Sequence, residues 1–126
     1  MHKSIIFTGV LATLVGSAMS ADVELDTDLM HTIEDTNKSL AANIAAKDAK
    51  SSTNDAKELE ALFGKVEEYF VTKGDADDAV ALSKKIKALS SDIVKSVSAS
   101  DFDAATNFAT TLSRTCKTCH NFYKKS

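Results

Sequence analysis

The sequence contains no proline and only four glycines, and two of these, Gly9 and Gly16, lie in the first twenty residues. A β-protein of many strands needs a turn about every ten residues, and turns rely on these residue types. Their scarcity therefore excludes a many-stranded β-protein and favours long helices with few connections. At 126 residues, 44% of them hydrophobic, the chain is long enough for one domain with its own core.

Several functional classes also lack their usual residues. The formal net charge is −3, and no basic stripe is present that would neutralise phosphates, so nucleic-acid binding is not expected. The sequence shows neither a nucleophile–His–acid pattern nor a glycine-rich phosphate loop. We therefore do not expect an enzyme.

The N-terminus has the features of an export signal. A short positive start, Met1–Lys3, is followed by an apolar run over Ile5–Val15 and then by small residues. The tripeptide 18–20 (AMS) fits a small-x-small cleavage site, which places cleavage near Ser20 or Ala21. The apolar run is too short to span a bilayer, although a membrane anchor is the alternative.

The predicted domains follow from this cleavage site. Residues 1–21 are expected to be a signal peptide, and 22–126 the mature domain, exported to the periplasm. Loss of Lys3 leaves 14 basic against 18 acidic side chains. No later stretch is apolar enough to cross a membrane, so no membrane span is expected in the mature form.

Apolar residues recur at spacings of three and four in four later segments, as on one face of a helix. These segments run from about Asp26 to Ala49, from Asn54 or Asp55 to Lys73, from Asp77 to Ser98, and from a cap at Ser100 to the end of the chain. Polar breaks at 50–53, Gly74 and 98–100 separate them. The pattern predicts an all-α fold, an antiparallel four-helix bundle with up-down-up-down topology.

The most specific motif is Cys116-Lys117-Thr118-Cys119-His120. Two thiols one helical turn apart can each add to a vinyl group of one haem, and the adjacent imidazole can bind its iron. The motif therefore predicts one covalently attached haem c, with Cys116 and Cys119 as its thioether attachments and His120 as the proximal axial ligand.

Three other interpretations of the two cysteines fit less well. A thioredoxin-like pair belongs at the start of a helix in a βαβ fold, where the helix dipole lowers a thiol pKa, and this pair lies near the end of the last segment. A structural zinc site needs four ligands, and besides the two cysteines the mature chain offers only His31 and His120. A structural disulfide would close a very small loop and stabilise little.

Met30 is the expected distal ligand. It lies about one turn after the first segment begins, and His120 lies about one turn before the last segment ends, so an antiparallel pair places them at one level. A thioether opposite an imidazole raises the reduction potential of haem iron. Two alternatives stay open: Met30 as an ordinary core residue, and His31 as the ligand in its place, although His31 is rotated by about 100° toward the polar face.

The same topology predicts the walls of the haem pocket. The expected lining residues are apolar or aromatic and come from all four segments: Ile33, Val66, Tyr69, Phe70, Val80, Leu82, Ile86 and Tyr123. Apolar walls exclude water and favour the ferrous state.

The chain resembles the class II c-type cytochromes, cytochrome c-prime and its low-spin relatives. The resemblance rests on a four-helix bundle with C-x-x-C-H near its C-terminus and on the segment 114–124 (RTCKTCHNFYK), with an aromatic residue three after the haem His and Lys124 four after it. The family often has Arg at that last position, and Lys lacks its planar fork. The resemblance also implies a possible homodimer.

The segment 30–35 (MHTIED) is in addition similar to the four-helix periplasmic cytochrome b, in which a Met near the start and a His near the end hold a non-covalent haem. The expected function is therefore one-electron transfer to and from redox partner proteins. The alternative is a five-coordinate haem protein that binds nitric oxide or another small gas. The lysines at 117, 124 and 125 form a basic patch that would steer an acidic partner, or simply a solvated helix end.

Overall fold

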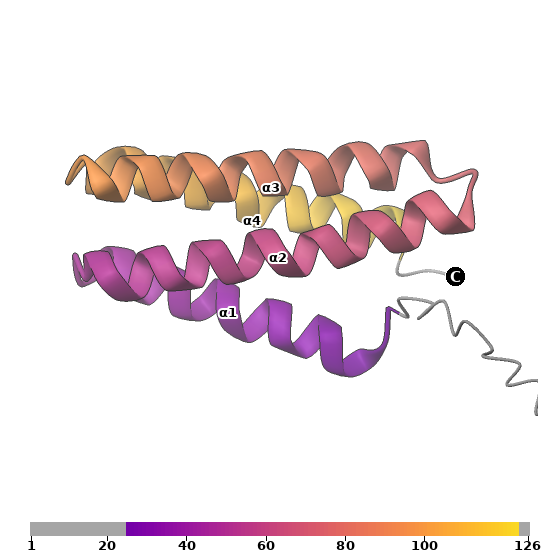
Figure 1. Ribbon diagram of the computed structural model, residues 1–126, viewed down its shortest axis with the longest axis horizontal. Helices are drawn as coiled ribbons and strands as arrows, with labels where there is room; N and C mark the ends of the chain where they lie inside the picture. Colours follow the sequence, from indigo (N-terminus) through magenta and orange to yellow (C-terminus); the bar gives the residue numbers. More distant parts are fainter. Residues whose placement is uncertain (1–24, 124–126) are drawn as a thin grey trace, which may run out of the picture.

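The computed structural model describes residues 25–123, with the side chains of 122 and 123 excepted, so the predicted signal peptide and the lysines at 124 and 125 lie outside the described residues. The described chain forms four helices and no strand: α1 (Thr27–Ala45), α2 (Ala49–Lys73), α3 (Asp77–Ser98) and α4 (Phe102–Tyr123). Successive helices run in opposite directions and are joined by short turns (Figure 1). The predicted all-α four-helix bundle is confirmed.

Aspartates cap three of the helices, and two of these caps differ from the prediction. Asp26 accepts a hydrogen bond from the Leu29 N–H at 2.7 Å, as expected for the start of α1. Asp48 caps α2 by accepting a hydrogen bond from the Ser51 N–H at 3.0 Å. Residues 50–53 therefore belong to α2, and the predicted break at these positions was wrong. Asp101, rather than Ser100, caps α4 through the Ala104 N–H at 3.0 Å.

Positive backbone φ angles explain where the helices end. The true break between α1 and α2 is at Lys47, with φ of 55°, and Ser100 has φ of 57° in the turn before α4. Gly74, predicted to separate the second and third segments, does lie between α2 and α3, and its φ of 75° is one that glycine adopts without strain. Lys and Ser are not typical of this conformation, so composition alone misplaced two boundaries.

The core follows the predicted apolar faces. The side chains that are buried from solvent come from all four helices, and they include Ile33, Leu40, Ile44, Leu59, Leu62, Phe63, Val66, Phe70, Ile86, Leu89, Ile93, Val97 and Leu112. Buried hydroxyls were not predicted: Ser83 and Ser90 donate to the carbonyls four residues earlier, at 2.7 and 2.9 Å. These local bonds let small polar residues lie in the core at little cost.

The four helix interfaces differ in how extensively they pack, and the site lies at the sparsest one. α3 packs extensively against α2 and α4, and α1 packs mainly against α2, whereas α1 and α4 have the sparsest of these interfaces and α1 does not contact α3. In Figure 1, α1 diverges from α2 toward its own first turns. No helix in the described part of the chain is long and apolar enough to span a membrane.

A polar cluster fastens the C-terminal half of α1 to α2. The Asp55 carboxylate accepts hydrogen bonds from the Ser39 hydroxyl and the Asn43 amide, each at 2.7 Å. Asp55 was predicted as a helix cap, and it instead lies within α2 and bridges two helices.

We expect Asp55→Ala to lower the free energy of unfolding by about 1–2 kcal/mol, because hydrogen bonds to a partly exposed carboxylate are lost on both sides of the α1–α2 interface. Urea denaturation followed by circular dichroism measures the change. Asp35→Ala, an exposed acidic residue of α1, is the control and should change stability by less than about 0.5 kcal/mol. Equal effects of the two substitutions would contradict the assigned role.

Candidate functional site

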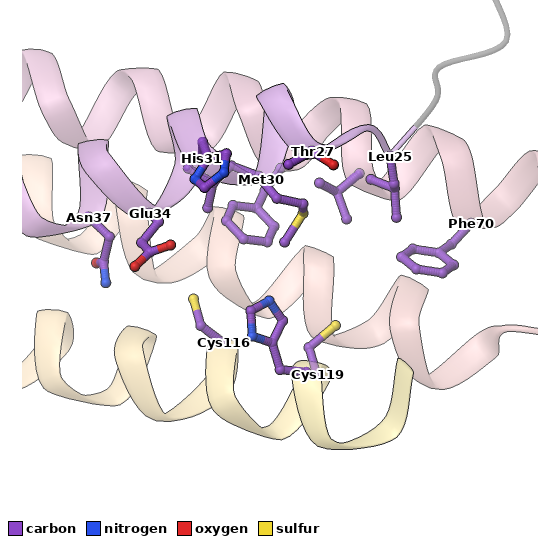
Figure 2. A pocket seen from close by; sticks show the side chains of 13 residues that line it. Leu25, Thr27, Met30, His31, Glu34, Asn37, Phe70, Cys116 and Cys119 are labelled. Carbon is purple, nitrogen blue, oxygen red and sulfur yellow. The ribbon is translucent and has the colours of Figure 1, made fainter. Parts of the chain in front are cut away.

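A cavity of about 440 Å³ lies between α1, α2 and α4. Its volume falls within the range of small-molecule and cofactor sites. Apolar side chains from α1 and α2 line it, together with polar side chains from α1 and the two cysteines from α4 (Figure 2). The lining residues are Leu25, Thr27, Met30, His31, Ile33, Glu34, Asn37, Phe63, Val66, Phe70, Cys116, Cys119 and His120.

Helix α4 contributes the two cysteines and the histidine of the predicted motif to this cavity. Cys116 and Cys119 are one helical turn apart, and Figure 2 shows both sulfur atoms directed from α4 toward α1. Both cysteines are free thiols and half-buried, and the adjacent His120 is exposed at the cavity. One turn of helix therefore presents two thiols and an imidazole to one space.

Helix α1 contributes the predicted thioether on the other side. The Met30 sulfur points from α1 toward α4 (Figure 2), and the side chain is partly buried against the core. His31 is exposed, as the prediction held, and it lines the same cavity. The described chain thus brings Met30, His120 and both cysteines together and keeps the alternative ligand His31 beside them.

The predicted apolar walls are found in part. Ile33, Val66 and Phe70 line the cavity, whereas Tyr69 and Ile86 do not. The Tyr69 ring packs edge-on against Phe70, with centroids 5.1 Å apart, and lies under the Lys73 ammonium.

Ile86 is fully buried in the core of α3. No α3 residue lines the cavity, because α3 lies diagonally across the bundle from α1 and does not contact it. The predicted wall residues Val80 and Leu82 therefore do not line it either. The side chain of Tyr123, the remaining predicted wall residue, lies outside the described part of the chain.

Sequence reasoning missed Leu25, Thr27, Glu34, Asn37 and Phe63 as lining residues. Helical spacing offered a signal for two of them, because Glu34 and Asn37 follow Met30 by four and seven residues and so share its face. The Glu34 side chain is 61% exposed and pairs with Lys38 at 3.1 Å, and it also forms part of the cavity rim.

Burial sets the acid–base behaviour of the two thiols. Desolvation, with a smaller contribution from the neighbouring Cys119, raises the pKa of Cys116 to about 11. Desolvation also raises the pKa of Cys119. Both thiols are therefore protonated at neutral pH, whereas the nucleophilic cysteine of a thioredoxin-type pair has a lowered pKa.

The Glu34 carboxylate responds to the charges around the cavity. The hydrogen bond and charge of Lys38 lower the pKa of Glu34, and the charges of His31 and His120 lower it further. The rim therefore carries a negative charge at neutral pH. Among residues 25–123, no three His, Cys, Asp or Glu side chains form a cluster suited to a metal ion, so the zinc interpretation gains no support there.

Comparison of the chain with protein-family models, with curated proteins and with solved structures finds no match. The assignment of a function consequently depends on the residues of the cavity and their arrangement.

We expect Cys116 in the unmodified, folded chain to react with iodoacetamide at pH 8 about 100-fold more slowly than a thiol with a pKa of 9.0, because only the thiolate attacks and the pKa of Cys116 is about 11. Mass spectrometry of quenched samples gives the rate. The control is the same chain in denaturant, where both cysteines should react as free cysteine does.

The stability of the folded chain should fall at high pH. The folded chain holds the Cys116 proton more tightly than the unfolded chain does, so the contribution of this thiol to the free energy of unfolding is complete below pH 9 and declines as pH rises toward 11. If the folded chain were alkylated at neutral pH as fast as free cysteine, the raised pKa of Cys116 would be contradicted and a thiol–disulfide function favoured.

Proposed function

We propose that this chain is a periplasmic electron carrier that holds one c-type haem in the cavity between α1, α2 and α4. Cys116 and Cys119 would form the thioether attachments, and His120 and Met30 the two axial ligands. The observation that carries the proposal is that one cavity collects two thiols, an imidazole and, from the facing helix, a thioether.

The chemistry of the lining fits this group. Haem is a flat apolar ring with a polar, carboxylate-bearing edge, and the cavity pairs an apolar wall of Phe63, Val66 and Phe70 with a rim of polar α1 residues. His and Met are a known pair of haem ligands in electron-transfer proteins. In the described chain no three His, Cys, Asp or Glu side chains are clustered as a metal site, and neither thiol has a lowered pKa.

The attachment reaction needs no oxidant. Each thiol adds across a vinyl double bond, so that the sulfur bonds to one vinyl carbon and the thiol proton is transferred to the other. The high pKa values of Cys116 and Cys119 keep that proton on sulfur until the reaction. Protonated thiols also resist competing oxidation, which requires thiolate.

A bound haem iron would supply a one-electron couple between its ferrous and ferric states. The protein would contribute two ligands from packed helices, so that neither has to be gained or lost on electron transfer. The apolar wall would disfavour the additional positive charge of the ferric state and raise the reduction potential. These properties fit an electron carrier, whose partners would be other redox proteins.

The resemblance of the motif region and of the helix order to class II c-type cytochromes supports the same proposal. The signal-like residues 1–21 support export to a compartment where such haem is attached. Binding of nitric oxide or another small gas is the second candidate. It is favoured by the position of Met30, which is only partly buried and at an accessible cavity, where a ligand can displace it.

Covalent attachment is tested by expressing the full chain in a host with cytochrome c maturation. We expect a coloured protein that keeps its haem through acid–acetone extraction. The Cys116→Ala/Cys119→Ala double variant should lose all of it, because no thioether remains. Thr118→Ala, within the motif, is the matched control and should keep it. A colourless mature protein would contradict the proposed function.

The distal ligand is tested by the absorption and spin state of the ferric protein. We expect the wild type to be low-spin and Met30→Ala to become largely high-spin with a lower midpoint potential, because a thioether ligand raises that potential. His31→Ala should leave both unchanged. A spectrum altered by His31→Ala but not by Met30→Ala would assign the ligand to His31, and a high-spin wild type would favour the gas-binding candidate.

A further inference from the structure

Helices α1 and α4 share one hydrogen bond between side chains in the described part of the chain. The Asn37 amide nitrogen donates to the Ser113 hydroxyl at 3.3 Å, in a partly buried position. Asn37 also lines the cavity, at the end away from Phe70 (Figure 2). The α1–α4 interface is the sparsest of the four helix interfaces, and few other contacts fix α1 relative to α4.

The Asn37–Ser113 bond has the same register between α1 and α4 as the proposed iron ligands. Asn37 lies seven residues after Met30, and Ser113 lies seven residues before His120. Seven residues are about two helical turns, or about 10.5 Å, and return to nearly the same helix face. In antiparallel helices, pairing Asn37 with Ser113 therefore pairs Met30 with His120.

Apolar packing alone specifies this register weakly. Both helices carry apolar residues at spacings of three and four, so a slip of one turn, about 5.4 Å, again places apolar side chains against apolar side chains. A polar pair between helices is lost on such a slip, and polar pairs of this kind fix the register of coiled coils. The same slip would move Met30 one turn away from His120.

We propose that the Asn37–Ser113 hydrogen bond sets the register of α1 against α4 and thereby positions Met30 opposite His120. This inference rests on the proposed function for its consequence, because Met30 needs this position only if both residues bind one iron. Asn37 is thus a positioning residue, and it does not itself bind iron.

The first test uses the haem-loaded protein. Asn37→Leu removes the donor and keeps the side chain's size, and we expect the ratio of Met-bound low-spin to high-spin ferric protein to fall about fivefold, the equivalent of one ordinary hydrogen bond. Asn43→Leu is the matched control, since it removes an Asn hydrogen bond from α1 to α2 rather than to α4. It should leave the spin ratio unchanged even if it lowers stability.

Rescue separates positioning from general stability. The exchanged pair Asn37→Ser/Ser113→Asn restores a donor and an acceptor across the same interface, and we expect it to restore the spin ratio. A low-spin spectrum in Asn37→Leu that equals the wild type, or equal losses in Asn37→Leu and Asn43→Leu, would overturn the inference.

The second test uses the haem-free chain. In a double-mutant cycle of Asn37→Ala and Ser113→Ala, we expect the unfolding equilibrium constants to be coupled by about fivefold. The pair Asn43→Ala and Ser113→Ala should be additive. Absence of coupling would overturn the inference with no haem involved, whereas failure of the wild type to take up haem would contradict only the proposed function.

Discussion

Met30 and His120 lie ninety residues apart in the sequence, and they line one cavity only because α1 packs beside α4 in the opposite direction. The first and last helices of an up-down-up-down bundle are neighbours, so the beginning of one lies at the level of the end of the other. This arrangement brings together the residues that α1 and α4 contribute to the cavity. The α1–α4 interface is also the sparsest helix interface in the bundle, which leaves room for a cavity.

The rest of the bundle supplies the stability that the site does not. Leu40, Leu59, Ile93 and Leu112 are almost completely buried in the core formed by the four helices. The Asp55 cluster holds α1 against α2 in the C-terminal half of α1, just beyond the last α1 residue that lines the cavity. α1 diverges from α2 toward its first turns (Figure 1), whereas its C-terminal half is hydrogen-bonded to α2.

The sequence predicted the fold, and it predicted that Met30, Cys116, Cys119 and His120 would lie together, because the signals for both are periodic and local. Helical spacing located the core faces, and C-x-x-C-H together with Met30 identified four side chains that the fold collects. The walls were harder to predict, because Tyr69 and Ile86 satisfy the same apolar spacing as Val66 and Phe70. Ile86 lies outside the site because α3 is diagonal to α1, and the Tyr69 ring packs against Phe70 without reaching the cavity.

The boundary between α1 and α2 was predicted wrongly for a different reason. The residues 50–53 are polar but compatible with a helix, whereas Lys47 turns the chain in a left-handed conformation that its side chain gives no sign of. His31 shows a further limit of periodicity, since a residue 100° from the inward face still reaches a cavity where the neighbouring helix has moved away.

The size of the cavity explains why polar residues surround its opening. A sealed, dry void of about 440 Å³ would cost about 10 kcal/mol, comparable with the entire stability of a small domain. The cavity instead opens between α1 and α4, where His31, Glu34 and His120 are exposed to solvent. The polypeptide can therefore fold around an open, partly apolar space. A flat apolar group that fills this space would recover the missing contacts.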